Sequence, residues 1–231
     1  MREMTLPESG SKRKLFDAAV QLFANKGFDA VSIRDITHAA GLNVASVNYH
    51  FGGREGLLAL VVRHFLTPVN EDRLVRLNAI DRKGAGKVLP LEEIVDAWVR
   101  PIIDQASNSG LSEELFYHLL GRIFAWHGDG VPLEIEASLQ SVTDRFTRAL
   151  AKALPSLAGG DLNWRIHFLS GALIHGLTHQ ELLQRSAKEG GGGVETGSMF
   201  NHFIRFSIAV LGGSLEVGGT ASRGPQATFD F

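Results

Sequence analysis

Residues 32–51, SIRDITHAAGLNVASVNYHF, decide the fold of this chain. Ser32 and Asp35 form a capping-box pattern, in which the acid also suits the positive end of a helix. Apolar residues then recur at helical spacing up to Ala40, and this spacing predicts one buried stripe. Gly41 follows directly, where a chain that turns sharply out of a helix needs a positive φ. The segment therefore predicts a short helix that ends in a tight turn.

A second short helix follows the turn. Asn43 is a good N-cap residue. Val44, Val47 and Phe51 fall on one face of the helix that follows. A helix that packs through this face and presents small, hydrogen-bonding side chains outward can enter the DNA major groove. The segment thus predicts a helix-turn-helix, and its outward residues are Ala45, Ser46, Asn48 and Tyr49.

The preceding segment, from about Ser11 to Asn25, predicts a further helix that ends at Gly27. Lys12, Arg13 and Lys14 begin it, although cations are mildly unfavourable at a helix N-terminus. These charges suggest contact with an external anion such as phosphate. The alternative is a simply solvated charged end. The apolar stripe of this helix consists of Leu15, Ala18, Ala19, Leu22 and Phe23.

Residues 11–60 resemble the DNA-binding domain of the TetR family of transcriptional regulators. The resemblance rests on Ala19, Phe23, Gly27-Phe28, Ser32–Ile36, Ala39–Gly41, Tyr49–Phe51 and Glu55–Leu58. Asn48 replaces the aromatic residue that the family usually has before its Tyr-His-Phe triplet. An asparagine that faces base edges can bind adenine through two hydrogen bonds. The Asn-Tyr-His-Phe-Gly variant is similar to a branch that includes regulators of fatty-acid metabolism.

The resemblance implies a provisional set of DNA contacts. Ser32 and Arg34 would touch phosphate or bases from the first helix of the motif, and Ala45, Ser46 and Asn48 would face base edges. Tyr49, His50 and Arg54 correspond to phosphate-contacting residues, and Arg54 stands where lysine is commoner. Half-buried packing is the alternative for Tyr49, and bracing of the domain interior is the alternative for His50.

The composition is that of a globular chain. Its 231 residues are 44% hydrophobic and 21% charged, which suits a small head and one larger domain. Residues 1–65 hold 8 Lys and Arg against 6 Asp and Glu, whereas the remainder holds 15 against 19. The absence of cysteine excludes disulfides and thiolate sites. With no signal peptide or long apolar run in view, we expect a cytoplasmic protein without a membrane partner or a cofactor.

Beyond the head the chain predicts an all-α fold. A long connecting helix that Pro68 kinks or divides would lead through a loop at 83–90 to further helices. These helices are expected at about 91–107 (interrupted by Pro101), 112–127, 132–154, 161–187 and 195–211. We expect a head at 1–60, a helical effector-binding and dimerisation domain at 61–212, and a flexible tail at 213–231. The run Gly190–Gly193 is expected to be a flexible connector.

The last two long helices are the predicted pairing surface of a homodimer. One short recognition helix contacts few base pairs, so helix-turn-helix proteins commonly pair to read a palindromic operator. The alternative is that these residues form the core of one subunit. His175 and His179 are spaced to reach one metal, but no third ligand can be assigned, so we expect none. The predicted interface is Gly171, Ala172, His175, Gly176, His179, Phe200, Phe203 and Ile204.

The central helices predict an effector pocket. Small-molecule sites are mostly apolar with a few polar anchors. Arg122 and His118, four residues apart beside an aromatic set, could hold an anion; a core with a solvated salt bridge is the alternative. The branch similarity implies a fatty acid or acyl thioester, against another hydrophobic compound. The predicted pocket residues are Trp98, Phe116, His118, Leu120, Arg122, Phe124, Phe146 and Phe168, with Tyr117 and Trp126 beside them.

The leading functional hypothesis is a homodimeric, ligand-responsive transcriptional repressor that a small apolar effector releases from double-stranded operator DNA. The competing class is an enzyme that uses the helical domain and has a degenerate head; against it, the sequence shows no nucleophile elbow, phosphate loop or convincing metal cluster. A DNA-binding scaffold without an effector would have a filled core in place of a cavity.

Overall fold

The computed structural model describes residues 10–84, 88–126, 132–157, 159–182, 185 and 196–213. Within these ranges every regular element is a helix, and the all-α prediction is confirmed. The Gly190–Gly193 connector and almost all of the tail predicted at 213–231 lie outside them. The helices are α1 (Ser11–Lys26), α2 (Ile33–Ala40), α3 (Val44–Phe51), α4 (Arg54–Lys83), α5 (Leu91–Asn108), α6 (Glu113–Ala125), α7 (Leu133–Ala153), α8 (Gly159–Thr178) and α10 (Thr196–Gly212).

Local capping signals place the boundaries of the head helices. Ser32 and Asp35 make the complete capping box at the start of α2, and Gly41 ends α2 in the left-handed region with a φ of 65°. Asn43 then caps α3 by accepting a hydrogen bond from the backbone N–H of Ser46. The predicted helix-turn-helix is therefore present in the structure.

Two prolines do not divide their helices. The 30-residue α4 continues through Pro68, so the division that was one of the two predictions for Pro68 is absent, and α5 continues through Pro101, where an interruption was predicted. A proline removes one intrahelical hydrogen bond, but burial of apolar side chains on both sides of it holds each helix together. The predicted helix at 161–187 was also too long, since α8 ends at Thr178 and residue 179 interrupts the helical run.

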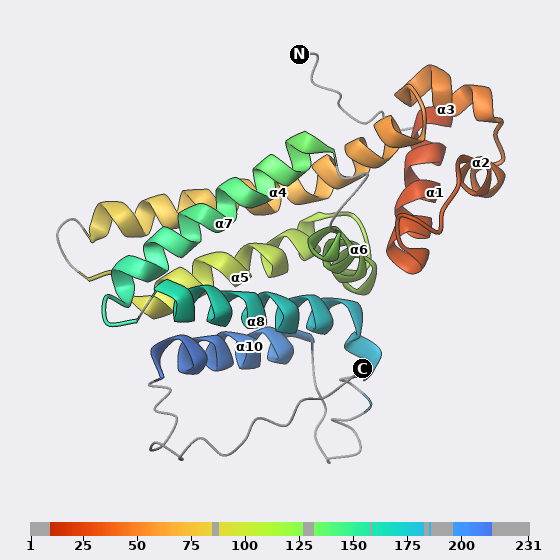
Figure 1. The fold of residues 1–231 in the computed structure, drawn as a ribbon. Helices are drawn as coiled ribbons and strands as arrows, with labels where there is room; N and C mark the ends of the chain where they lie inside the picture. The colour runs from red at the N-terminus through yellow and green to blue at the C-terminus, as the bar shows by residue number, and fades with distance from the viewer. Residues whose placement is uncertain are drawn as a thin grey trace, which may run out of the picture.

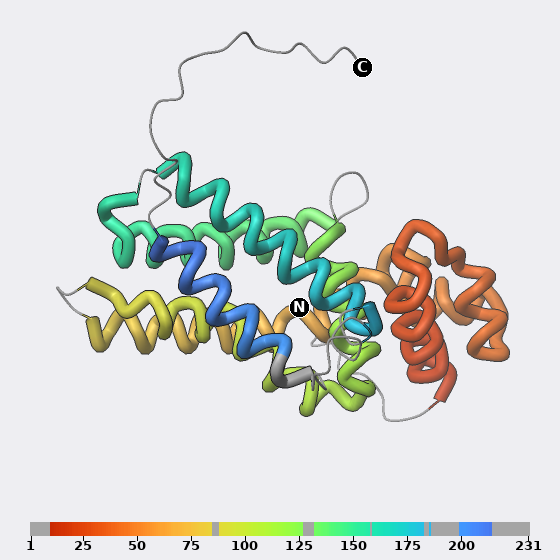
Figure 2. The backbone as a smooth tube through the Cα atoms, turned by 90° about the horizontal axis from the view of Figure 1, so that it is seen from below, coloured from red at the N-terminus to blue at the C-terminus, as the bar shows by residue number. Residues whose placement is uncertain are grey.

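The helices form a head at one end of a layered body (Figure 1). α1, α2 and α3 make the head, and α4 leads from it along one side of the body next to α7. α5 and α6 fill the middle, and α8 and α10 lie together on the opposite side (Figures 1 and 2). One buried apolar cluster runs from α1 through α4 into α6 and α10, so the core is continuous across the boundary predicted at residue 60.

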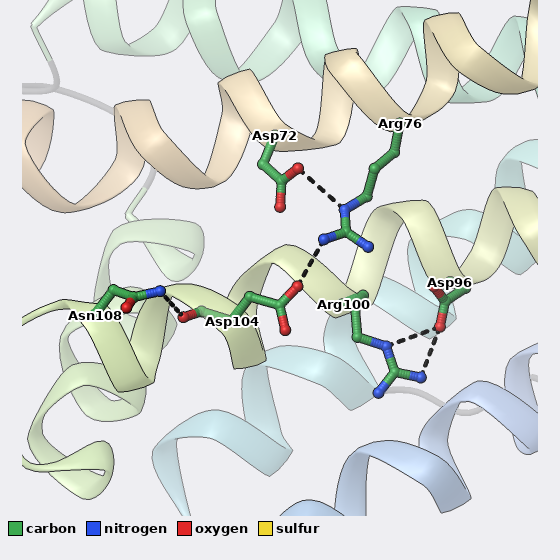
Figure 3. A network of polar contacts seen from close by, with 6 residues as sticks. All are labelled: Asp72, Arg76, Asp96, Arg100, Asp104 and Asn108. Carbon is green, nitrogen blue, oxygen red and sulfur yellow. Dashed lines mark hydrogen bonds and ion pairs between the residues drawn. The ribbon is translucent and has the colours of Figure 1, made fainter.

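An ion pair joins α4 to α5 at the surface of the body, beside pairs within each of these helices (Figure 3). Arg76 of α4 binds Asp72 of its own helix at 3.1 Å and Asp104 of α5 at 2.6 Å. Hydrogen bonding to Asp72 is the main reason that the pKa of Arg76 is raised. Arg100 and Asp96 pair within α5 at 2.8 Å. Such partly exposed pairs each stabilise a fold by at most about 1 kcal/mol, so they align the two helices more than they hold them.

Candidate DNA interface, cavity and pairing surface

The outward face of α3 presents the side chains that the sequence assigned to DNA. Ala45, Asn48 and Tyr49 are exposed, and Tyr49 is the extreme case at 86%. Val47 and Phe51 are buried on the opposite face, as the pattern predicted, but Val44 is 37% exposed and lies outside that apolar face. An exposed tyrosine beside an exposed asparagine gives this surface an aromatic hydroxyl and an amide, both groups of the kind that contact DNA in other proteins.

Two of the predicted contact residues also cap helices. Ser46 donates its hydroxyl proton to the Asn43 side chain at 3.0 Å, so it helps to hold the start of α3. The Ser32 hydroxyl and backbone N–H both donate to Asp35, and these bonds are the main cause of the lowered pKa of Asp35. Arg34 is exposed next to this cap, and its contact with phosphate or bases stays a prediction.

His50 and Arg54, two other predicted phosphate contacts, are both partly buried in the head. His50 is half-buried, with its ring 5.0 Å from that of Tyr49, which leaves both of its predicted roles open. Arg54 donates from Nε to the Val31 carbonyl at 2.8 Å and from Nη2 to the Phe28 carbonyl. Its guanidinium therefore braces the loop before α2, and this geometry favours bracing over phosphate contact.

Among the cations at the start of α1, Arg13 is exposed and forms an ion pair with Asp17 at 2.8 Å. Lys12 extends over the ring of Phe51, 6.0 Å from its centroid, so it lies next to the end of α3. This position keeps a positive charge close to the predicted DNA-facing surface. The anion contact inferred for the start of α1 remains a prediction.

A cavity of about 390 Å³ lies in the body between α4, α5, α6, α7 and α8. Trp98 and Phe124 line it, as predicted, and so does Trp126 just after α6. The buried polar residues Asn70 and Arg73 were not foreseen in its lining, because they lie on α4, which the sequence suggested only as a connector. The complete lining is Asn70, Arg73, Trp98, Phe124, Trp126, Glu136, Leu139, Gln140, Val142, Thr143, His167, Ser170, Gly171, Leu173 and Ile174.

Six of the predicted pocket residues lie elsewhere. Phe116 and Leu120 are buried in the cluster between α1 and α6, and Phe146 is buried in the second cluster with α5 and α8. Apolar side chains at helical spacing fill a core as readily as they line a cavity, which is why these assignments failed. Phe168 is 64% exposed on the outside of α8. The remaining two are His118, which is half-buried, and Arg122, which is exposed beside Gly27 of the head.

The exposed sides of α8 and α10, together called the outer face, carry aromatic side chains that the sequence did not point to as an interface. Trp164 and Phe168 stack with centroids 5.7 Å apart and are 62% and 64% exposed, and Phe206 of α10 is 52% exposed. Large apolar side chains grouped on one face commonly mark an interaction surface. The signal that could have found them is their position on the side of each helix opposite its buried stripe.

The predicted pairing residues divide between this face and the core. Gly171, Ala172, His175 and His179 are exposed, and Gly171 also lines the cavity. Phe200 is fully buried against Tyr117, so its assignment to a free interface is corrected to the core. The partly covered members are Gly176, Phe203 and Ile204.

His175 and His179 face each other in parallel, with ring centroids 4.5 Å apart. The Nδ1 atom of His179 is 2.8 Å from the Thr178 hydroxyl. Within the described ranges, no group of three or more His, Asp or Glu side chains could hold a metal ion.

No described helix is long and apolar enough to cross a membrane.

Two relatives are similar to this chain over half of its length or less. The HTH-type transcriptional repressor KstR2 of Rhodococcus jostii is 29% identical over 116 residues, which cover 50% of this chain and 55% of the repressor. The probable HTH-type transcriptional regulator YttP of Bacillus subtilis is 42% identical over 55 residues, covering 24% of this chain and 27% of the regulator. These matches thus span about half or less of the relatives' lengths.

Solved structures share the fold over most of the chain. Mycobacterium smegmatis AmtR superposes with a TM-score of 0.56 at 15% identity, covering 91% of this chain and 90% of AmtR. A Clostridium perfringens protein described as a fatty acid metabolism regulator gives 0.51 at 16% identity, covering 87% of this chain and 98% of that protein. Identities this low establish the fold alone.

Two family profiles match successive parts of the chain. The profile of bacterial regulatory proteins of the tetR family matches residues 15–61, which hold the head and the start of α4. The profile of the tetracyclin repressor-like C-terminal domain matches residues 96–209, which hold most of the body. The capped helix-turn-helix, the helical body and these matches together show that the chain belongs to the TetR family of transcriptional regulators, which is not a family of enzymes.

Proposed function

We propose that this chain is a ligand-responsive repressor that binds operator DNA as a homodimer and releases it when a small molecule fills the cavity. The observation that carries the proposal is the double position of Trp126. Its side chain lines the cavity, and its ring lies 4.7 Å from that of Phe28 in the head. One side chain therefore touches both the space for a ligand and the DNA-binding unit.

The contacts beyond Phe28 support transmission into the head. The Phe28 ring packs against Phe23 of α1 at 5.5 Å, and its carbonyl accepts a hydrogen bond from Arg54. Arg54 also binds Val31, directly before the cap of α2. A ligand that displaces Trp126 would thus act on the loop that positions the helix-turn-helix. It can shift the equilibrium only by the difference in its affinity for the two conformations.

The exposed face of α8 and α10 supports pairing of two copies. Stacked Trp164 and Phe168 together with Phe206 offer apolar area on helices that lie side by side (Figure 2). Gly171 and Ala172 of α8 are small and exposed, and residues of this kind would permit close approach of a second helix. A dimer would place two recognition helices to read half-sites separated by about 34–36 Å or a multiple of that.

Selection of duplexes from a random DNA pool, followed by anisotropy titration, tests DNA recognition. We expect a palindromic consensus, bound with two protein chains or a multiple of two per site, and at least about 10³-fold weaker binding to a scrambled duplex. Equal, weak binding to both duplexes would reject a site-specific regulator.

The oligomeric state tests the pairing surface separately. Light scattering after size exclusion is expected to give a dimer for the unaltered chain and a monomer for the double variant Phe168→Glu and Phe206→Glu. Leu133→Glu is the matched control, because Leu133 is 82% exposed on α7, away from this face, and its variant should stay dimeric. A double variant that is still dimeric would move the interface elsewhere.

The role of Trp126 is tested once a ligand that releases DNA has been found. Trp126→Leu is expected to bind both DNA and ligand while the ligand releases far less DNA. Calorimetry of ligand binding without DNA separates loss of coupling from loss of the ligand site. Full release of DNA from this variant would exclude Trp126 as the connection.

A further inference from the structure

Arg73 of α4 is a buried cation without an acidic partner among the described residues. Its residue is 3% exposed, and its guanidinium lies 5.1 Å from the centroid of the Phe124 ring. Nε donates to the Trp98 carbonyl at 2.9 Å and Nη1 to the Asn70 side-chain oxygen at 3.2 Å. Burial lowers the pKa of Arg73 to about 9, which leaves the group charged at neutral pH.

The other arginines show how unusual this environment is. The arginines that form ion pairs within the described ranges, such as Arg63 with Glu134, are all at least partly exposed. Arg165 is the other buried arginine in the described part of the chain, at 5% exposure, and its Nη1 donates to three carbonyls at the end of α10. Arg165 thus caps the C-terminal end of α10, whereas the Arg73 guanidinium donates to only one backbone carbonyl and one side-chain amide oxygen among the described residues.

The charged side chain of Arg73 lines the cavity. Arg73 and Asn70 form the buried polar part of the lining, while Glu136, Gln140 and His167 are exposed residues on α7 and α8. The Asn70 amide also donates to the Ser138 hydroxyl at 3.3 Å, which orients its oxygen toward Arg73. Nη2 has no hydrogen-bond partner among the described residues, so the Nη1–Nη2 edge remains available to a ligand.

A buried charge without a counter-charge is costly, and a bidentate carboxylate is the geometric match for a guanidinium edge. The rest of the lining includes Trp98, Phe124, Trp126 and Leu139, which suit a hydrocarbon. We infer that the cavity binds an apolar monocarboxylate, with its carboxylate on the Nη1–Nη2 edge of Arg73 and its apolar body against these side chains. This inference rests on the proposed function only in treating the cavity as the effector site.

Three probes of equal chain length test the head-group requirement. Calorimetry with the full chain, without DNA, would compare decanoate with 1-decanol and decylamine. We expect decanoate to bind about 10- to 100-fold more tightly than decanol, because charge-assisted hydrogen bonds add that much affinity. Equal binding of decanol, or tighter binding of decylamine, would overturn the inference.

Variants locate the binding. Arg73→Met should remove the preference for decanoate, and Leu139→Trp should reduce binding of all probes by filling the cavity. Arg76→Met is the matched control on the same helix, since Arg76 pairs outside the cavity with Asp72 and Asp104 (Figure 3). If Arg73→Met fails to fold, Arg73→Lys should keep a weaker preference for decanoate. If Arg73→Met or Arg73→Lys keeps the full preference for decanoate over decanol, the carboxylate binds elsewhere.

The same probes separate this inference from the proposed function. If decanoate binds at Arg73 but does not release operator DNA, the inferred ligand class is supported and the proposed ligand response is refuted. If an uncharged compound releases DNA and decanoate does not bind, the proposed ligand response is supported and the inferred carboxylate ligand is refuted. Each result therefore bears on one of the two claims.

Discussion

Replacement of Arg54 by glutamine separates two roles that its position allows. In the structure the guanidinium donates to the carbonyls of Phe28 and Val31 and lies 5.9 Å from the Phe23 ring. Hydrogen bonds from a charged donor each contribute about 1.5–3 kcal/mol, but the side chain is 25% exposed, which reduces that figure. We expect Arg54→Gln to lower the free energy of unfolding by about 3 kcal/mol.

Urea unfolding and a salt series measure the two roles independently. With a slope near 3 kcal/mol per molar, the loss lowers the urea midpoint by about 1 M. A brace leaves the salt dependence of DNA binding unchanged, whereas a lost phosphate contact reduces the slope of log K against log salt by about 0.9. Arg34→Gln is the matched control, because Arg34 is exposed on α2 and should change only the slope. An Arg54→Gln variant with an unaltered midpoint and a reduced slope would refute the bracing role.

Three further changes test the head and its junction with the body. Asn48→Ala should alter base preference by about 1–3 kcal/mol at one position while the fold is intact, and selected consensus sequences that match the unaltered chain would contradict this. Gly56→Ala should cost about 3 kcal/mol in thermal unfolding, because a Cβ there would lie 1.9 Å from the Phe51 carbonyl oxygen; an unchanged melting temperature would exclude the clash. Burial, with a smaller effect of Arg13, lowers the pKa of His64, so the unfolded chain takes up more protons and stability should fall as pH drops from 6.5 through the lowered pKa. His64→Gln should flatten this part of a stability–pH curve.

The head could be predicted because its signals are local. The cap at Ser32, the left-handed turn at Gly41 and the cap at Asn43 are each specified by residues within three or four positions of one another. Such signals do not depend on what packs against the helix. The role of Arg54 escaped them, because its partners lie 23 and 26 positions away in the chain.

The cavity could be predicted only in part, because packing of five helices creates it. The aromatic residues Trp98 and Phe124 were recognised, but the same criterion also selected Phe146, which is core, and Phe168, which is exposed. Arg73 gave no sequence signal, since an arginine on a long amphipathic helix is usually solvated. Only the structure shows that its side of α4 faces inward.

The length of α4 has a mechanical consequence. Arg54, which braces the head, and Arg73, which lines the cavity, belong to this one helix and are separated by about 28 Å along its axis. As a lever arm of that length, α4 turns a tilt of about 7° at the cavity into a displacement of about 3.4 Å at the head, the rise of one base pair. In a pair of chains the two displacements add, so half that tilt at each cavity would move the recognition helices out of step with their half-sites. Pro68 lies within this arm, where the missing hydrogen bond makes the helix easiest to bend, and bending there would reduce the movement that reaches the DNA.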